Sequence, residues 1–345
     1  MSQDAILAQA QRAVTGKEVP GIAVARIDAG RAPRIAAYGR ADLGSGRVLR
    51  AHNVFQAASI GKLVTACAIL RLVEAGALAL DDAVPRRVRR WTFPQTPHDL
   101  DGVTLRRVLC HSAGLSLPDY PGFDPGAAMP TLEQSLSGAT NGGGDLRVIA
   151  PPGGAFLYSG GGFTLLQLLI EEITGEAFAG HIRRTIFAPL GMVQSGFTSD
   201  EALVAQAATG HDRYGRPVPF FRFDGLAAAG MLTTAGDLAR FLGALIAAHD
   251  GREGGIVSPA ALRLIATPLA QTGRVDGLWA GYGLGCEVDE RADGRRVIGH
   301  HGMNRGWRAI AAAEPARGRA LVLLSNGDAA LPALEAVYEA WAGEG

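Results

Sequence analysis

The chain has 345 residues, of which 48% are hydrophobic and 19% charged, and its 33 basic and 33 acidic residues give a formal net charge of zero. This length and composition exclude a disordered or fibrous chain and are typical of a globular protein with one large or two medium domains. The balanced charge, without a basic stripe or an acidic tail, argues against a nucleic-acid partner.

The N-terminal region is predicted to contain one helix and one hairpin. Residues 2–12 have the apolar spacing of an amphipathic helix and lack the basic start and apolar core of a secretory signal. Residues 21–28 and 34–39 are β-prone runs joined by a glycine-containing turn, the pattern of an antiparallel hairpin. Since no apolar run is long enough to span a bilayer, we expect no membrane partner and a cytoplasmic protein, or a periplasmic one if a leader was trimmed.

The stretch after this hairpin joins a strand to a helix. Val54 and Phe55 are β-prone, and from Ser59 apolar residues recur at helical spacing, which predicts a helix with Ser59 near its N-cap and its end at Gly76. Because residues three apart share a helix face, Ser59 Oγ and the Lys62 amine are expected side by side. A hydroxyl beside a proton acceptor is what an activated serine nucleophile requires.

Lysine is rare in this chain. Of the 33 basic residues only Lys17 and Lys62 are lysine, and the others are arginine. Arginine stays protonated in proteins, whereas a lysine partly removed from water loses its proton near neutral pH and can act as a base. This choice favours a catalytic pair over the alternative, a serine cap followed by a solvated lysine.

The middle of the chain is predicted to be mainly helical, with two long irregular segments. Residues 116–154 are rich in Gly, Pro and Asp, and so long a connection usually forms a lid or a site wall. Residues 200–229 bring Phe220, Phe221 and Phe223 together, either in the core or as an apolar pocket wall. Helices are expected at 104–111, capped by Thr104, and at 163–173, 177–187 and 233–248.

From residue 276 onward the pattern changes to strands and ends in a helix. Together with the first hairpin this predicts an α+β fold, in which an antiparallel sheet built from both ends of the chain is flanked by N- and C-terminal helices and carries a helical insertion. The expected domains are a sheet domain, 1–78 with 225–345, and a mainly helical domain with lid-like loops, 79–224. The strands are expected at 279–288, 295–301, 307–313 and 320–324, and the helix at 331–342.

Tyr158 is a candidate partner for Ser59. It lies just before a glycine run at the entrance to the 163–173 helix, where its side chain is expected to point into a pocket. Because a neighbouring ammonium favours the phenolate, Tyr158 beside Lys62 is expected to accept the Ser59 proton and return it to a leaving group. The alternative is a tyrosine that covers the edge of the core.

A third candidate is the strand that carries His300, His301 and Gly302. Gly302 would allow another molecule to approach the backbone closely, and the Met303 N–H is expected to pair with the Ser59 N–H as an oxyanion hole. Either histidine would add a donor near the substrate. The alternative is a pair of partly buried, hydrogen-bonded residues at a strand end.

We expect neither a metal nor a cofactor. Paired histidines are compatible with a metal, but no further ligand lies at motif spacing. The three cysteines, Cys67, Cys110 and Cys286, are odd in number and far apart, which indicates neither a disulfide framework nor a zinc site.

The order of these motifs resembles that of the serine β-lactamase and penicillin-binding-protein superfamily. Ser59-x-x-Lys62, Tyr158-Ser159 and His300-His301-Gly302 follow one another as the family's three motifs do. The arrangement looks most like class C β-lactamases and the related esterases and D-amino-acid peptidases. The resemblance covers nearly the whole chain and includes further blocks at 104–115, 187–192, 229–238 and 282–285.

This resemblance implies a serine hydrolase that acts through an acyl-enzyme on a small ester, amide or β-lactam. Ser59 would be the acylated nucleophile, and Lys62 with Tyr158 would be the general base system. His300 would stand where many members carry the lysine of a Lys-Thr-Gly motif. The Ser59 and Met303 N–H groups would form the oxyanion hole, and the substrate contacts would come from His301, Gly302, Gly160, Asn304 and Phe221.

Two departures from the family pattern bear on the substrate. Gly160 stands where the family's lactamases usually have an asparagine, so an amide that would hold the substrate's acylamino group is missing. His300 in place of lysine weakens a fixed positive charge for a substrate carboxylate, since histidine is largely neutral at pH 7. Both departures favour an ester or small amide over a β-lactam.

Two other interpretations remain at this point. Residues 57–61 could be a variant nucleophile elbow of an α/β-hydrolase with His300 as base, although too few strands precede Ser59 for that fold. The protein could also be a covalent sensor that is acylated by a peptidoglycan-like ligand without turnover. The sequence leaves the physiological substrate and the oligomeric state open.

Overall fold

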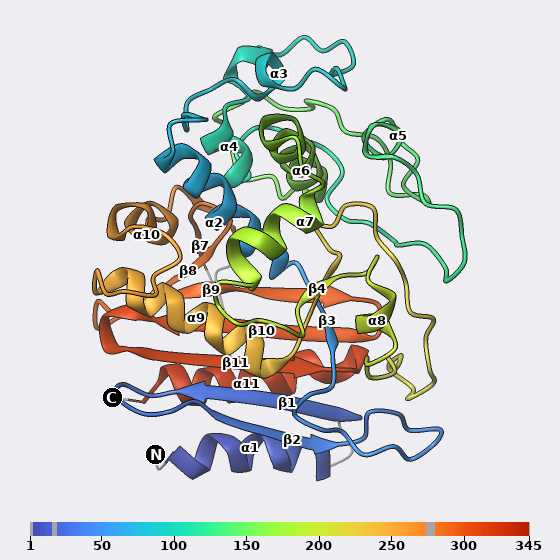
Figure 1. Ribbon diagram of the computed structural model, residues 1–345, viewed down its shortest axis with the longest axis vertical. Coiled ribbons are helices and arrows are strands. Elements are labelled where there is room, and N and C mark those ends of the chain that lie inside the picture. The colour runs from blue at the N-terminus through green and yellow to red at the C-terminus, as the bar shows by residue number, and fades with distance from the viewer. Residues whose placement is uncertain (1–2, 16–18, 274–279, 345) are drawn as a thin grey trace.

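The centre of the fold is an antiparallel sheet made from both ends of the chain (Figure 1). A computed structural model describes residues 3–15, 19–273 and 280–344. The sheet has the strand order β2-β1-β11-β10-β9-β8-β7-β6 in this part of the chain, which confirms the predicted α+β class. Its strands are β1 (Gly21–Ile27), β2 (Arg34–Gly39), β6 (Ala270–Gln271), β7 (Gly281–Tyr282), β8 (Glu287–Glu290), β9 (Arg296–Asn304), β10 (Trp307–Glu314) and β11 (Arg319–Ser325).

The sheet is covered by helices on both faces (Figure 1). Side chains alternate along a strand, so Ile22 and Val24 of β1 pack against the layer of α1 (Gln3–Thr15) and α11 (Leu331–Ala342). Ala23 and Ala25 belong to the core on the other face. That second face carries α9 (Ala235–His249) with α10 (Pro259–Ala266) beside it. The helices predicted at both ends of the chain and at 233–248 are therefore confirmed.

The predicted strand 279–288 is interrupted. The structure has two short strands, β7 and β8, separated by a turn in which the Gly283 N–H donates to the Cys286 carbonyl at 2.7 Å. Gly285 in this turn has a φ of +64°, and a Cβ there would lie 2.6 Å from the Cβ of Ala66 in the helix over residues 61–74. The turn therefore lets the sheet approach that helix closely, while Trp279, the predicted start, lies outside the described residues.

The mainly helical part of the chain lies above the sheet in Figure 1 and is arranged around α2 (Gly61–Glu74). This helix is buried from Gly61 to Leu70 because it lies between β9 and α6. Its apolar residues therefore need not form a single stripe. The other helices are α3 (Val84–Arg87), η1 (Leu100–Gly102), α4 (Leu105–Leu109), α5 (Leu132–Leu136), α6 (Gly160–Thr174), α7 (Phe178–Ile182), the π-helix η2 (Arg183–Phe187), α8 (Glu201–Val204), η3 (Pro315–Arg317) and η4 (Asp328–Ala330).

Several boundaries differ from the sequence predictions. Thr104 caps its helix as expected, but α4 ends at Leu109 rather than at His111. The long segment 116–154 contains α5, whose N-terminus is closed by a capping box between Thr131 and Gln134. Residues 200–229 likewise contain the short helix α8, capped by Asp200. Local capping thus orders parts of both segments predicted as irregular.

A small second sheet was not predicted as a unit. It has the order β3-β5-β4 and is antiparallel, with bounds β3 (Phe55–Ala58), β4 (Gly196–Phe197) and β5 (Met231–Thr233). It fixes the chain immediately before α2. In the described ranges, none of the helices combines the length and apolar character needed to cross a membrane.

Candidate active site

Ser59 lies at the turn from β3 into α2. Ala58 has a φ of +50°, a left-handed conformation that is unusual for alanine, and the helix cap is Ile60 rather than Ser59. The sequence placed Ser59 near the N-cap, but its hydroxyl does not serve as a cap. It is instead directed at two other side chains.

Those two side chains are Lys62 and Tyr158. The Lys62 Nζ lies 3.0 Å from Ser59 Oγ, and the Tyr158 hydroxyl lies 3.0 Å from the same oxygen. Lys62 also donates to the Ala228 carbonyl at 2.7 Å and is only 2% exposed. The alternative of a solvated lysine is therefore wrong. Lys62 and Tyr158 both lie within hydrogen-bonding reach of Ser59 Oγ.

Burial lowers the pKa of Lys62 and raises that of Tyr158. Removal from water lowers the pKa of Lys62 to about 7, although the negative charges of Asp119 and Glu287 act to raise it. Burial raises the pKa of the Tyr158 phenol above its ordinary value, with Ser59 hydrogen bonding as a smaller opposing effect. This direction is opposite to the phenolate expected from the sequence, so neutral Lys62 is the better proton acceptor near pH 7.

The edge of β9 approaches Ser59 from the sheet. The β8–β9 pairing extends to the pair Glu287 and Gly299, and beyond it the His301 N–H donates to the Glu287 carboxylate at 3.1 Å. Since N–H directions alternate along a strand, the Met303 N–H faces the same edge as that of His301. Met303 and Ser59 line one cleft, and the pairing of their N–H groups as an oxyanion hole stays a prediction.

Gly302 allows this edge to come close, but what it approaches is the chain itself. A Cβ at this position would lie 2.1 Å from the Ala57 carbonyl oxygen of β3. The glycine therefore lets β9 pack against the residues just before Ser59. The sequence predicted a close approach here but assigned it to another molecule.

A cleft of about 790 Å³ opens at Ser59 and Lys62. Its walls include part of the 116–154 segment, as expected for a site wall. Charged residues stand on two sides, with Asp119 and Asp124 on that segment and Arg305 at the β9–β10 turn, where its guanidinium lies 5.4 Å from the centre of the Phe221 ring. Of the residues predicted to contact substrate, Gly160, Asn304 and Phe221 line the cleft, whereas His301 and Gly302 are absent from its lining.

Gly160 is required by packing as well as by its place in the cleft. A Cβ there would lie 2.8 Å from the Pro118 carbonyl oxygen. An asparagine at this position would have to displace the 116–154 segment. Packing in this protein therefore leaves no space for a side chain at position 160.

His300 does not reach the cleft. It is 0% exposed, and its Nε2 lies 3.0 Å from the Tyr282 hydroxyl. Burial lowers the pKa of His300 to about 4, so the ring is neutral at pH 7. The role of a donor that touches substrate, expected from the sequence, is not available to a side chain in this position.

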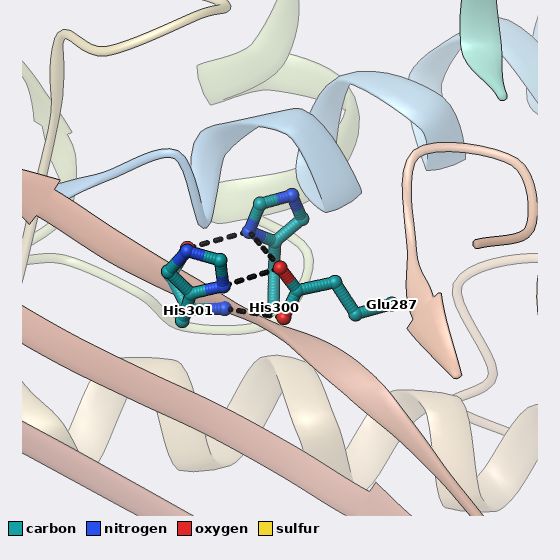
Figure 2. A group of neighbouring side chains, drawn as sticks. All are labelled: Glu287, His300 and His301. Carbon is teal, nitrogen blue, oxygen red and sulfur yellow. Dashed lines mark hydrogen bonds and ion pairs between the residues drawn. The ribbon is translucent and has the colours of Figure 1, made fainter. Parts of the chain in front are cut away.

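Figure 2 shows Glu287, His300 and His301 side by side. Their possible ligand atoms lie within 4.8 Å of one another, a spacing compatible with a metal ion. However, His301 Nδ1 already forms an ion pair with Glu287, and His300 Nδ1 donates to the His301 carbonyl, so that nitrogen carries a proton. These mutual contacts explain the cluster without a metal. Burial acts to raise the pKa of Glu287, but His301 and His300 outweigh it and the pKa is lowered.

Sequence reasoning missed the residues that support this site. Glu287, His111 and Tyr282 are all buried, and each contacts His300, His301 or Tyr158. His111 and Tyr282 lie in two of the sequence blocks that resemble the β-lactamase superfamily, which was the only signal available for them. Glu287 had no such signal, because only strand pairing brings it next to His301.

Comparisons with known proteins support the resemblance to the β-lactamase and penicillin-binding-protein superfamily. A family model described as Beta-lactamase matches residues 7–342. The octameric penicillin-binding protein homologue from Pyrococcus abyssi has a similar structure, with a TM-score of 0.83, 25% sequence identity, and coverage of 100% of this chain and 78% of that chain.

Relatives with assigned names include a binding protein and two hydrolases. Penicillin-binding protein 4 from Amycolatopsis lactamdurans is 29% identical over 92% of this chain and 83% of its own length. Esterase EstB from Burkholderia gladioli is 32% identical over 55% of this chain and 49% of its own length. D-aminopeptidase from Brucella anthropi is 30% identical over 84% of this chain and 52% of its own length. The chain thus spans about half the length of these two hydrolases.

Proposed function

Because the chain belongs to the Beta-lactamase family and is a serine hydrolase, we propose that it cleaves small esters or amides through an acyl-enzyme formed on Ser59. The observation that carries the proposal is the pair of 3.0 Å distances from Ser59 Oγ to Lys62 Nζ and to the Tyr158 hydroxyl. A class C-like use of these residues is part of the same proposal. Relatives named as an esterase and a D-aminopeptidase support the substrate range.

Acylation uses Lys62 as base and Tyr158 as acid. Neutral Lys62 takes the Ser59 proton as Oγ bonds to the substrate carbonyl carbon, and the carbonyl electrons move onto oxygen. The Ser59 and Met303 N–H groups stabilise that oxyanion. When it collapses, the bond to the leaving group breaks and the Tyr158 hydroxyl protonates the departing alcohol or amine. The acyl-enzyme is left with a Lys62 ammonium beside a Tyr158 phenolate.

Deacylation reverses the two roles. The phenolate of Tyr158 takes a proton from water as the water oxygen attacks the acyl carbon. The second oxyanion collapses and releases Ser59 Oγ, which recovers its proton from the Lys62 ammonium. Lys62 becomes an ammonium during acylation, and only then does its charge favour the Tyr158 phenolate. Tyr158 can therefore be neutral at rest and still act as a base in deacylation.

The cleft favours esters and small amides over β-lactams. Gly160 offers no amide to a substrate's acylamino group, and its contact with Pro118 leaves no room for one. The buried, neutral His300 supplies no positive charge for a substrate carboxylate. Both features remove contacts that a β-lactam would use.

Amino-acid amides are a second candidate substrate class. Asp119 lines the cleft, its charge acts on Lys62, and its side chain makes no hydrogen bond or ion pair within the described ranges. An exposed carboxylate in that position would attract a substrate ammonium. The D-aminopeptidase relative supports this alternative.

A substrate panel tests the proposal. We expect sustained turnover of p-nitrophenyl acetate or butyrate or of a D-amino-acid amide, slow hydrolysis of nitrocefin, and loss of all three activities in Ser59→Ala. Mass spectrometry should detect one acyl group on the wild-type protein and none on Ser59→Ala. Nitrocefin hydrolysis much faster than ester hydrolysis would overturn the substrate preference, and a burst without turnover would instead favour a covalent sensor.

A further inference from the structure

Three buried aromatic side chains connect the two halves of the active site. The Ser159 N–H donates to His111 Nδ1 at 3.1 Å, and His111 Nε2 lies 3.2 Å from the Tyr282 hydroxyl. That hydroxyl lies 3.0 Å from His300 Nε2, and His300 Nδ1 contacts the His301 carbonyl. His111, Tyr282 and His300 are at most 2% exposed. We call these three residues the His–Tyr–His bridge.

The groups at the two ends fix the direction of every hydrogen bond in the bridge. A backbone N–H only donates, so His111 Nδ1 accepts and its proton must be on Nε2. His111 therefore donates to Tyr282, and the Tyr282 hydroxyl donates to His300 Nε2. The remaining His300 proton is then on Nδ1 and points to the His301 carbonyl, which only accepts.

Only neutral histidines satisfy this arrangement. A protonated His300 would direct an Nε2–H at Tyr282, whose oxygen already accepts from His111, and the tyrosine proton would lose its acceptor within the bridge. Buried polar groups without partners are unfavourable. Burial also lowers the pKa of both histidines, which agrees with the geometry.

The bridge ends at parts of the chain that the proposed reaction needs. Ser159 directly follows Tyr158 and caps α6, and the His111 ring lies 4.3 Å from the Tyr158 ring, centre to centre. At the other end, His301 is two residues before Met303, and its own N–H is held by Glu287. One continuous set of hydrogen bonds thus joins the segment carrying the acid to the strand carrying the oxyanion donor.

We propose that His111, Tyr282 and His300 are positioning residues, which hold the Tyr158 hydroxyl in register with Ser59 and the β9 edge through a hydrogen-bond chain of one fixed direction. The role of Tyr158 in this statement rests on the proposed function. His300 then acts through Tyr282 and His111 and does not touch substrate.

The tautomers give a test that is independent of activity. In two-bond ¹H–¹⁵N spectra of the wild-type protein at pH 7, His111 is expected as the neutral Nε2–H tautomer and His300 as the neutral Nδ1–H tautomer. The signals are assigned with His111→Gln and His300→Gln. An imidazolium or the opposite tautomer at either residue would overturn the proposal.

A kinetic test uses Tyr282→Phe, which removes the central hydroxyl. A misplaced Tyr158 slows the departure of a leaving group that needs a proton, such as ethanol, more than that of p-nitrophenolate, which does not need one. In this variant kcat/KM should therefore fall at least about tenfold further for ethyl butyrate than for p-nitrophenyl butyrate. Equal losses for both esters, or no loss for either, would show that the hydroxyl does not position the acid.

Tyr338→Phe is the matched control. Tyr338 is buried in α11 and its hydroxyl donates to Asp289 at 2.8 Å, away from the cleft. Its loss should lower Tm but leave the ratio of the two ester rates unchanged, and a changed ratio would contradict the proposal. If Tyr282→Phe does not fold, the wild-type tautomers decide the question. If the wild type cleaves neither ester, the proposed function fails while the tautomer test still stands.

Discussion

At the scale of single residues, the proton affinity of Lys62 is the property most open to measurement. We predict that kcat/KM for p-nitrophenyl butyrate rises with pH through a midpoint near the Lys62 pKa of about 7, because only neutral Lys62 accepts the Ser59 proton. In Asp119→Asn the midpoint should move to lower pH, since the Asp119 charge raises that pKa. The measurement is a pH–rate profile of each protein.

Asp124→Asn is the control for this shift. Asp124 lines the same cleft but is not among the charges that act on Lys62, so its removal should leave the midpoint in place. A wild-type midpoint far from pH 7 would contradict the role of Lys62 as base. So would a midpoint that Asp119→Asn does not move.

Replacing Lys62 should separate activity from stability. Lys62→Met is predicted to lower kcat/KM by about 10³-fold, because the general base is lost. The pKa of lysine is near 10.5 in the unfolded chain, whereas that of Lys62 in the folded protein is about 7. At pH 9 the unfolded state therefore binds a proton that the folded state does not, which lowers the free energy of unfolding by roughly 2 kcal/mol. Methionine does not titrate and carries no such cost. Urea unfolding at pH 9 should show the variant to be more stable than the wild type. A less stable variant would contradict the lowered pKa.

Motif spacing was enough to find Ser59, Lys62 and Tyr158, because the first two share one turn of backbone and the third precedes a glycine run. Spacing does not report burial, so it could not decide between a His300 that touches substrate and a buried, hydrogen-bonded one, nor show that the Tyr158 phenol is protonated at rest. Those properties depend on Tyr282, His111 and other residues far away in the sequence.

At the scale of secondary-structure elements, the contact between β3 and β9 sets where the proposed oxyanion donors lie. Gly302→Ala is predicted to lower kcat/KM by about 100-fold or more, since its Cβ would press on the Ala57 carbonyl and move β9 away from Ser59. Gly180→Ala is the control, because that glycine of α7 has open space around it. Full activity of Gly302→Ala would show that the contact is not needed.

Long, strongly patterned elements were predicted well, and short ones were not. Strands β9, β10 and β11 and helices α9 and α11 were found within a few residues because each carries its own apolar pattern. The strands β4 and β5 have two and three residues, and only pairing with β3 makes them strands. The break between β7 and β8 was missed for a similar reason, since it depends on how closely Gly285 approaches α2.

At the scale of the whole molecule, the buried neutral histidines make stability depend on pH. Burial lowers the pKa of His300 to about 4, whereas in the unfolded chain it is near 6.5, so the unfolded state binds more protons as the pH falls below 6.5. We predict that stability declines from pH 7 toward pH 4, with roughly 2 kcal/mol lost by pH 5 through His300 alone.

Urea unfolding at pH 7 and pH 5 measures this difference. In His300→Gln the loss between the two pH values should be smaller, because one proton-binding group has been removed from the unfolded state. A wild-type protein that is as stable at pH 5 as at pH 7 would show that His300 is not held neutral.

The division into a sheet domain, 1–78 with 225–345, and a helical domain, 79–224, stays a prediction. The antiparallel sheet excludes the α/β-hydrolase alternative, because a nucleophile elbow needs parallel strands around it. The sequence could foresee this because too few predicted strands precede Ser59.

The pairing of β1 with β11 has a consequence for biosynthesis. Because Ile22 lies opposite Ser325, the first strand to leave the ribosome must wait for almost the entire polypeptide before its neighbour on that side is available. Contacts so distant in sequence slow folding. Met303, the proposed second oxyanion donor, is also translated late, so a nascent or prematurely terminated chain that ends before it carries Ser59 without that N–H.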